Sequence, residues 1–372
     1  MLHFKNLLIL IITILIINTI SIFISCNDTG ITENEYQIEY YRATQFKNIY
    51  ENEIIILANK FVSQTTTFKQ QINSFKQTPL LENLIATQNS WKSVMNTWKQ
   101  LELYNLGAIE NSFIHFEINR WKTNTNLINS YIEGTDDINE AYINSKGSSA
   151  KGLAALEYLL FSSNNTQEVL NTLTNNNIRR LSYLLALADD LENKAIQLEA
   201  LWINNKNTFI TSVENSINGS QNQLTNAMVS LLEEIIIAKL GDPLGEQTNG
   251  VSDINLLEAY RSGYSLNIIY KHLIAIEKCY TGNFKENTIQ WGYDNYLNLI
   301  GKATLNKKIK ESFTDCKLKI SSIKNPLREE LINNKQNVVN LRASFTNLLI
   351  LIKVDLANAI GSTITISDND GD

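Results

Sequence analysis

The chain has 372 residues, of which 44% are hydrophobic and 19% charged, and its formal net charge is −6. That much apolar material can fill a substantial core, whereas a mildly acidic chain without a basic stripe is a poor partner for nucleic acid. Only three prolines and fifteen glycines interrupt the chain, so long helices are expected.

The N-terminus has the pattern of a bacterial lipoprotein signal peptide. Lys5 gives a short positive region, an apolar run follows, and the segment ends at "FISC", with small Ser25 before Cys26. We expect residues 1–25 to be cleaved and the Cys26 thiol to carry lipid, with residues 26–35 as a polar tether. The apolar run is also long enough to be an uncleaved membrane anchor, which is the alternative.

The residues after Cys26 indicate where the lipid would lie. Asn27 and Asp28 do not place an aspartate directly after the cysteine, the signal that commonly retains lipoproteins in the inner membrane. The sequence therefore favours a lipid-anchored protein of the cell envelope, at the outer membrane and facing the periplasm or the cell surface.

Helical periodicity begins after this tether and continues almost to the end of the chain. A first helix is expected over about 40–75, and a second carries Trp91, Met95 and Trp98 at spacings of four and three. Similar apolar repeats occupy 107–121, 177–202, 223–240, 254–280, 306–323 and 327–360. Only a few β-like residues follow Gly361.

We therefore predict an all-α fold made of two helical domains, each like a four-helix bundle. The first is expected over 36–220 and the second over 221–372, which includes an acidic C-terminal tail.

The mature chain keeps two cysteines besides Cys26, namely Cys279 and Cys316. In an oxidising compartment they can form a disulfide, and they can equally be two buried free thiols on separate helices. Neither has metal-ligand spacing to another cysteine or histidine.

Two histidines remain after the signal peptide is removed. His115 and Glu117 are two residues apart and do not share a helix face, and the five-residue spacing of His272 and Glu277 is also poor for one metal ion. We interpret both histidines as structural or surface groups.

One carboxylate stands among apolar residues in "KGLAALEYLLF", residues 151–161. A helix that is apolar on every face is buried all round, and Glu157 cannot enter it cheaply without a partner. Its own helix region offers Lys151 and Tyr158. We expect Glu157 at the seam between the two halves, with its partner in the segment "YRSGYS", which offers Arg261, Ser262, Tyr264 and Ser265.

Several stretches together resemble the imelysin family, exported all-α proteins first described as an insulin-cleaving peptidase. The family signature GxHxxE is similar to the run from Gly152 to Glu157. The stretches "WKSVMNTWKQLE", "KLGDPLG", "EAYRSGYSL" and "ISDNDGD" are similar to the Bacteroidetes-type lipoproteins of this family, in the expected order along nearly the whole mature chain.

The resemblance also shows a departure, because the family's histidine falls on Ala154. In the family pattern the histidine and glutamate lie three residues apart on one helix, so both can reach one ion. Ala154 has no lone pair to offer a metal, which disfavours peptidase chemistry and leaves no catalytic residue to assign.

Three functions compete on this basis. The first, which the resemblance favours, is a non-catalytic ligand-binding lipoprotein linked to iron acquisition, since several family members are iron-regulated or take part in iron uptake. The others are a structural or interaction protein, in which Glu157 only ties two bundles together, and a metallopeptidase. The cofactor is open, with iron as the candidate and Glu157 as its candidate ligand. The ligand-binding set comprises Glu157, Gly152, Tyr158, Arg261, Ser262, Tyr264 and Ser265.

Overall fold

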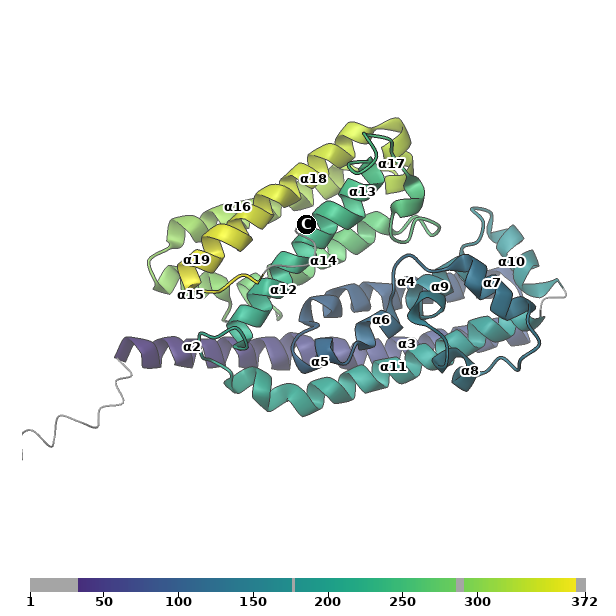
Figure 1. Cartoon of the computed structure of the whole chain (residues 1–372), viewed down its shortest axis with the longest axis horizontal. Coiled ribbons are helices and arrows are strands. Elements are labelled where there is room, and N and C mark those ends of the chain that lie inside the picture. The colour runs from purple at the N-terminus through teal and green to yellow at the C-terminus, as the bar shows by residue number, and fades with distance from the viewer. Residues whose placement is uncertain (1–32, 176–177, 286–290, 366–372) are drawn as a thin grey trace, which may run out of the picture. The chain divides into compact units, whose positions relative to one another are not determined.

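The computed structural model describes residues 33–175, 178–285 and 291–365 (Figure 1). Every regular element within these residues is a helix, so the all-α prediction is confirmed. The signal peptide, Cys26 and the acidic end of the tail lie outside the described residues. The chain divides into one unit up to Arg42, described here only as the start of helix α2 (Glu33–Ile49), and a second unit, Ala43–Asp372.

The first half of the second unit is built on three long helices. Helix α3 (Ile55–Gln77) packs against both α4 (Leu81–Leu101) and α11 (Ile178–Thr211). Trp91, Met95 and Trp98 of α4 are buried, as their spacing predicts. The short helices between α4 and α11 are α5 (Ala108–Asn111), α6 (Ile114–Ile118), α7 (Thr125–Glu133), α8 (Glu140–Asn144), α9 (Gly152–Leu160) and α10 (Thr166–Thr174).

Four longer helices form the second half. They are α12 (Ser220–Glu234), α14 (Ser265–Thr281), α16 (Ala303–Ser322) and α18 (Lys335–Ile350). Helix α16 packs against α14 and α18, and α14 also packs against α4 of the first half. The short helices are α13 (Asp242–Leu244), α15 (Tyr293–Leu299), α17 (Leu327–Asn333) and α19 (Ala357–Ile360). The expected division near residue 220 coincides with the start of α12, and two separate domains stay a prediction.

In the described part of the chain, three π-helical turns interrupt the long helices, at Tyr50–Ile54, Ile235–Gly241 and Leu351–Leu356. Such turns are rare and often occur at functional sites. Each of the three contains a charged side chain that pairs with another segment: Glu53 with Lys278, Lys239 with Glu258, and Lys353 with Glu233. Each of these π turns therefore lies where a charged side chain pairs with a neighbouring segment.

The helix expected over 254–280 begins only at Ser265. A short 3₁₀ helix (Ile254–Leu256) and a turn region precede it, in which Ala259 and Gly263 have φ angles of 54° and 68°. A left-handed residue breaks the helical repeat, and for alanine it is uncommon. The residues from Glu258 to Tyr264 consequently form a non-helical segment that ends at the start of α14.

The last expected helix, over 327–360, is also divided. Helix α17 ends at Asn333, and after Asn334 a continuous helical run from Lys335 to Ile360 follows. Among the described residues this run alone is long and apolar enough to cross a membrane. A core helix passes the same test, and Leu341, Phe345 and Leu348 are fully buried where α18 packs on α12 and α16. We therefore describe the run as part of the core.

The β-like prediction for the residues after Gly361 is wrong for the part that is described, because 362–365 forms no strand. Instead, the side chains of two helix α12 residues bond to this backbone. Asn222 accepts from the Thr363 amide and Asn226 accepts from the Thr365 amide, both at 2.8 Å. These amide side chains take the place that a neighbouring strand would have.

Cys279 on α14 and Cys316 on α16 are both buried and free. The interpretation as two separate thiols is therefore confirmed, and the disulfide is not formed. Burial raises the pKa of Cys316 to about 12, so its thiol stays protonated at neutral pH.

Candidate functional site

Helix α9 is fixed by contacts to its backbone. The indole of Trp91 on α4 donates to the Leu153 carbonyl at 3.0 Å, and the Gln88 amide donates to the Leu160 carbonyl at 2.6 Å. At the other side, Gly152 has φ of 72° and lies against α6, where any Cβ would collide with the Ile118 carbonyl oxygen. Glycine at position 152 is therefore required by the close approach of α6 to the first turn of α9.

Glu157 of α9 is buried, with 4% of its surface exposed. Its Oε1 accepts two hydrogen bonds from Ser262, one from the backbone amide at 2.8 Å and one from the hydroxyl at 2.9 Å. No other described residue donates to this carboxylate, so Oε2 accepts no hydrogen bond from them. The expected contact between Glu157 and the "YRSGYS" segment is confirmed.

Residues 258–265, which we call the seam segment, are held by helix α4 of the first half and by a hydrogen bond within the segment itself. The Asn96 amide of α4 donates to the Tyr264 hydroxyl at 2.8 Å, and the Ser265 hydroxyl donates to the Glu258 carbonyl at 2.5 Å. Tyr264 also lies edge-on to Trp91, with ring centroids 6.3 Å apart. The seam segment is thus anchored on the same helix that fixes α9.

Arginine and tyrosine side chains alternate beside Glu157. The guanidinium of Arg261 lies 4.4 Å from the ring centroid of Tyr260 and 5.2 Å from that of Tyr158, and Arg180 lies 5.1 Å from the same Tyr158 ring. Cations over aromatic faces are attracted by the ring quadrupole. Both guanidinium groups therefore have defined places next to α9.

Burial is the main influence on the Glu157 carboxyl, and it raises the pKa of this group above the ordinary value. The bonds from Ser262 and the charge of Arg261 act in the opposite direction, while the charge of Glu258 adds to the rise. The net effect of these influences is a raised pKa for Glu157.

The two partners that Glu157 could have had near its own helix bond elsewhere. Lys151 pairs with Glu117 and donates to the Asn144 carbonyl at 3.3 Å. The Tyr158 hydroxyl donates to Asn129 at 2.9 Å. Both side chains flank α9 without bonding to Glu157.

A second buried cluster, which sequence reasoning missed, is centred on Glu258, the first residue of the seam segment. Glu258 accepts from Lys99 at 2.8 Å, from Lys239 at 2.5 Å and from Asn119 at 2.9 Å. Both lysines are almost fully buried, and Lys239 pairs further with Glu234 at 2.6 Å. Although burial opposes charge, the two ammonium groups hold the pKa of Glu258 well below its usual range.

Glu102 extends this cluster to α14. It pairs with Lys99 at 2.8 Å and with Nε2 of the buried His272 at 2.7 Å. Burial lowers the pKa of His272 despite this bond, so the imidazole is neutral at pH 7 and donates to the carboxylate. The interpretation of His272 as a structural group agrees with this geometry.

The charged groups of this second cluster form ion pairs with one another. Both oxygens of Glu258 are bonded, and a carboxylate with three donors is a structural link between α4 and the second half. The sequence carries no signal for the pairing, because Lys99 and Glu258 are far apart in the chain. Glu157 differs from Glu258 in keeping one oxygen without a donor among the described residues.

No group of three or more histidine, cysteine, aspartate or glutamate side chains is arranged to hold a metal ion in the described part of the chain. Ala154, three residues before Glu157 on α9, is half-buried and offers no donor atom. Glu157 as a metal ligand stays a prediction.

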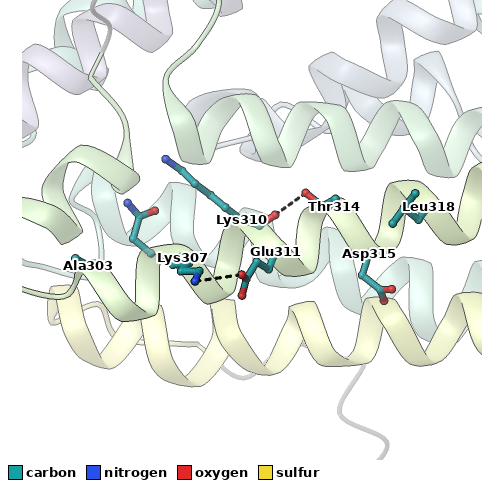
Figure 2. Close-up of a pocket in the computed structure, with 8 residues that line it drawn as sticks. Ala303, Lys307, Lys310, Glu311, Thr314, Asp315 and Leu318 are labelled. Carbon is teal, nitrogen blue, oxygen red and sulfur yellow. Dashed lines mark hydrogen bonds and ion pairs between the residues drawn. The ribbon is translucent and has the colours of Figure 1, made fainter.

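A shallow hollow of about 470 Å³ lies along α16, and its lining residues all come from this one helix (Figure 2). Both of its lysines are paired, Lys307 with Glu311 at 3.8 Å and Lys310 with Asp294 at 2.6 Å. None of its lining residues belongs to the Glu157 site or the Glu258 cluster. A hollow formed by one helix face, with these charges paired locally, is a weaker candidate than Glu157.

The imelysin family model (Peptidase_M75) matches residues 57–349. Iron-regulated protein A of Synechococcus elongatus is 22% identical over 193 residues, which are 49% of this chain and 49% of that protein. The match thus spans about half the length of this curated relative.

Two solved structures are similar in fold. An imelysin-like protein from Psychrobacter arcticum has a TM-score of 0.74 and 17% identity, over 88% of this chain and 98% of that chain. A candidate iron-regulated protein A precursor from Parabacteroides distasonis has a TM-score of 0.66 and 14% identity, over 87% of this chain and 95% of that chain. At these identities the likeness shows the fold alone.

Proposed function

This chain belongs to the imelysin family, and we propose that it is a non-catalytic cell-envelope protein that binds a ligand at Glu157 and takes part in iron acquisition. Two of the similar proteins carry iron regulation in their names, which supports the link to iron. The ligand-binding part of the proposal rests on the hydrogen bonding of the Glu157 carboxylate, because only one of its two oxygens accepts from a described residue.

Glu157 is buried in an apolar helix, yet only its Oε1 is bonded by a described residue. Oε2 is not among the fully buried polar atoms that lack a partner in the described residues, so this oxygen keeps some access to solvent. Ala154, Tyr158, Arg261 and Ser262 around it are all partly exposed, which supports a carboxylate lying just below the surface. Oε2 is then the atom that a ligand would reach.

The absence of catalysis is proposed from position 154. We place Ala154 where the family signature GxHxxE has histidine, so the first nitrogen ligand of a zinc-hydrolase arrangement is missing. His272 cannot replace it, because its Nε2 bonds to Glu102 within the second cluster.

A structural role for Glu157 is the alternative, and one observation favours it. The two bonds from Ser262 join α9 in the first half to the seam segment in the second half. In that case the tie itself would be the function of Glu157, with no small ligand.

A measurement of iron binding by the mature protein, purified without a histidine tag, distinguishes the ligand-binding function from the structural alternative. We expect equilibrium dialysis against ferrous iron, and separately against a weak ferric chelate, to leave iron bound to the wild type and not to Glu157→Gln. Glu311→Gln, an exposed change on α16, serves as the matched control and should bind as the wild type does. Wild-type protein that retains no iron under either condition would favour the structural alternative.

We further propose attachment to the membrane through lipid on Cys26, which the "FISC" boundary after an apolar run supports. Mass spectrometry of detergent-extracted protein should find an acylated N-terminal Cys26. A membrane-bound chain that still begins at Met1 would instead support an uncleaved anchor.

A further inference from the structure

Arg261 places a positive charge beside Glu157 that takes part in no ion pair within 4 Å among the described residues. Arg261 is partly exposed, and its guanidinium lies over the rings of Tyr260 and Tyr158. A guanidinium has five donors in a fixed planar fork, so stacking on its faces leaves those donors available at its edge.

The backbone around Arg261 is also fixed. Nη1 of Arg328 donates to the Tyr260 carbonyl at 2.8 Å and to the Arg261 carbonyl at 2.9 Å. On either side, the left-handed Ala259 and Gly263 set the shape of the segment. An arginine held by its backbone and by two aromatic rings loses little entropy when it binds, which is the advantage of a preorganised site.

Arg261 and Glu157 are neighbours of opposite charge that do not bond to each other. The charge of Arg261 acts on the Glu157 carboxyl, but the two side chains form no salt bridge within 4 Å. The result is a donor group at Arg261 next to an acceptor atom at Glu157 Oε2. A ligand between them would have to present an anionic group to the first and a hydrogen-bond donor to the second.

We propose that the ligand at Glu157 is a small hydroxycarboxylate, with a carboxylate on the Arg261 guanidinium and a hydroxyl that donates to Glu157 Oε2. This inference rests on the proposed function, since it names the ligand class of the same site. A carboxylate is the natural partner of a guanidinium fork, because two parallel N–H···O bonds can form. Arg180, on the same Tyr158 ring, adds positive charge on this side of α9.

The hydroxyl requirement follows from Glu157. An ionised carboxylate only accepts hydrogen bonds, so it repels a ligand carboxylate and attracts a ligand hydroxyl.

Citrate and tricarballylate, which is citrate without its hydroxyl, make a matched pair of probes. We expect isothermal titration calorimetry with the mature chain to show citrate binding at least ~10-fold tighter than tricarballylate. Arg261→Gln should weaken citrate binding about 10- to 100-fold, the range for one charge-assisted bond. The affinity of Arg261→Lys for citrate should lie between those of the wild type and Arg261→Gln, because lysine keeps the positive charge but lacks the planar fork of donors. Glu157→Gln should abolish the preference for citrate.

Arg120→Gln is the control, because its guanidinium also lies over an aromatic ring, 5.6 Å from the Phe116 centroid, and it should bind citrate as the wild type does. Unchanged thermal unfolding of Arg261→Gln shows that any loss is not misfolding. Citrate binding that is absent, or that is equal in wild type and Arg261→Gln, overturns the inference. If iron alone still binds in a Glu157-dependent way, the proposed function stands without this inference about the ligand class.

Discussion

Ser262 donates two hydrogen bonds to a single oxygen of Glu157, from its amide at 2.8 Å and its hydroxyl at 2.9 Å. The hydroxyl also lies 3.0 Å from the Ala259 carbonyl, so its one proton is shared between two acceptors. The amide bond is therefore the dependable part of this contact, and it joins two segments 105 residues apart in sequence.

Replacing Glu157 by alanine should destabilise the protein by about 1–3 kcal/mol, the cost of leaving a donor without its partner. The cost is moderate because the partner is a neutral, partly exposed serine and not a buried cation. Urea denaturation measures it, with Ser262→Ala as the companion variant that removes only the hydroxyl and should cost less. A loss near 5 kcal/mol would mean that Glu157 neutralises a buried charge.

The long helices could be predicted from the sequence because apolar spacing records which face is buried, and Trp91, Met95 and Trp98 are examples. The break before Ser265 could not be predicted from the sequence. It depends on a left-handed backbone conformation at Ala259, which an alanine does not indicate. At the site, the burial of Glu157 and its bond to the seam segment were predictable from one charge in an apolar helix. The pairing of Lys99 with Glu258 was not, since only the packing of distant segments creates it.

Glu258→Ala should destabilise the protein by about 3–5 kcal/mol, because it leaves Lys99 and Lys239 buried without this carboxylate. The same urea titration gives the value. The matched control is Glu246→Ala, which removes a partly exposed partner of Arg342 and should cost under about 1 kcal/mol. Equal small losses in both variants would show that the lysines find other partners or water.

The buried carboxylate of Asp190 should make the stability of the folded protein depend on pH. The carboxylate of this α11 residue is buried, neither of its oxygens has a hydrogen-bond partner among the described residues, and burial raises its pKa from 3.8 to about 6. Lys151 and Lys194 offset part of this rise, whereas Glu117 and Glu140 add to it. A raised folded-state pKa means that the contribution to stability is present below pH 4 and is lost as pH rises through about 6.

Asp190→Asn removes this titration, so its stability relative to the wild type should increase between pH 4 and pH 8, by on the order of 3 kcal/mol. Denaturation curves at both pH values provide the test. Asp189→Asn, which removes an ion pair with Lys69 on the surface, is the control and should show no such gain. Parallel pH profiles for Asp190→Asn and the wild type would contradict the prediction.

The two thiols should be unreactive in the native protein. Cys279 and Cys316 are both buried, and burial raises the pKa of each, so neither offers an accessible thiolate. An aromatic disulfide reagent should label both residues only after denaturation. Rapid labelling of either one under native conditions would show that α14 or α16 opens locally.

The protein should not cleave peptides, with or without added zinc. A catalytic zinc usually has three protein ligands and one open position. On α9 Ala154 supplies no ligand, Glu157 supplies at most one, and His272 is bonded to Glu102. Unfolded peptides incubated with the protein and zinc should therefore remain intact by mass spectrometry. Ala154→His, which restores an imidazole three residues before Glu157 on the same helix face, should raise zinc affinity and serves as the comparison. Cleavage by the wild type that a chelator stops and that Glu157→Gln abolishes would show that the zinc ligands come from elsewhere in the chain.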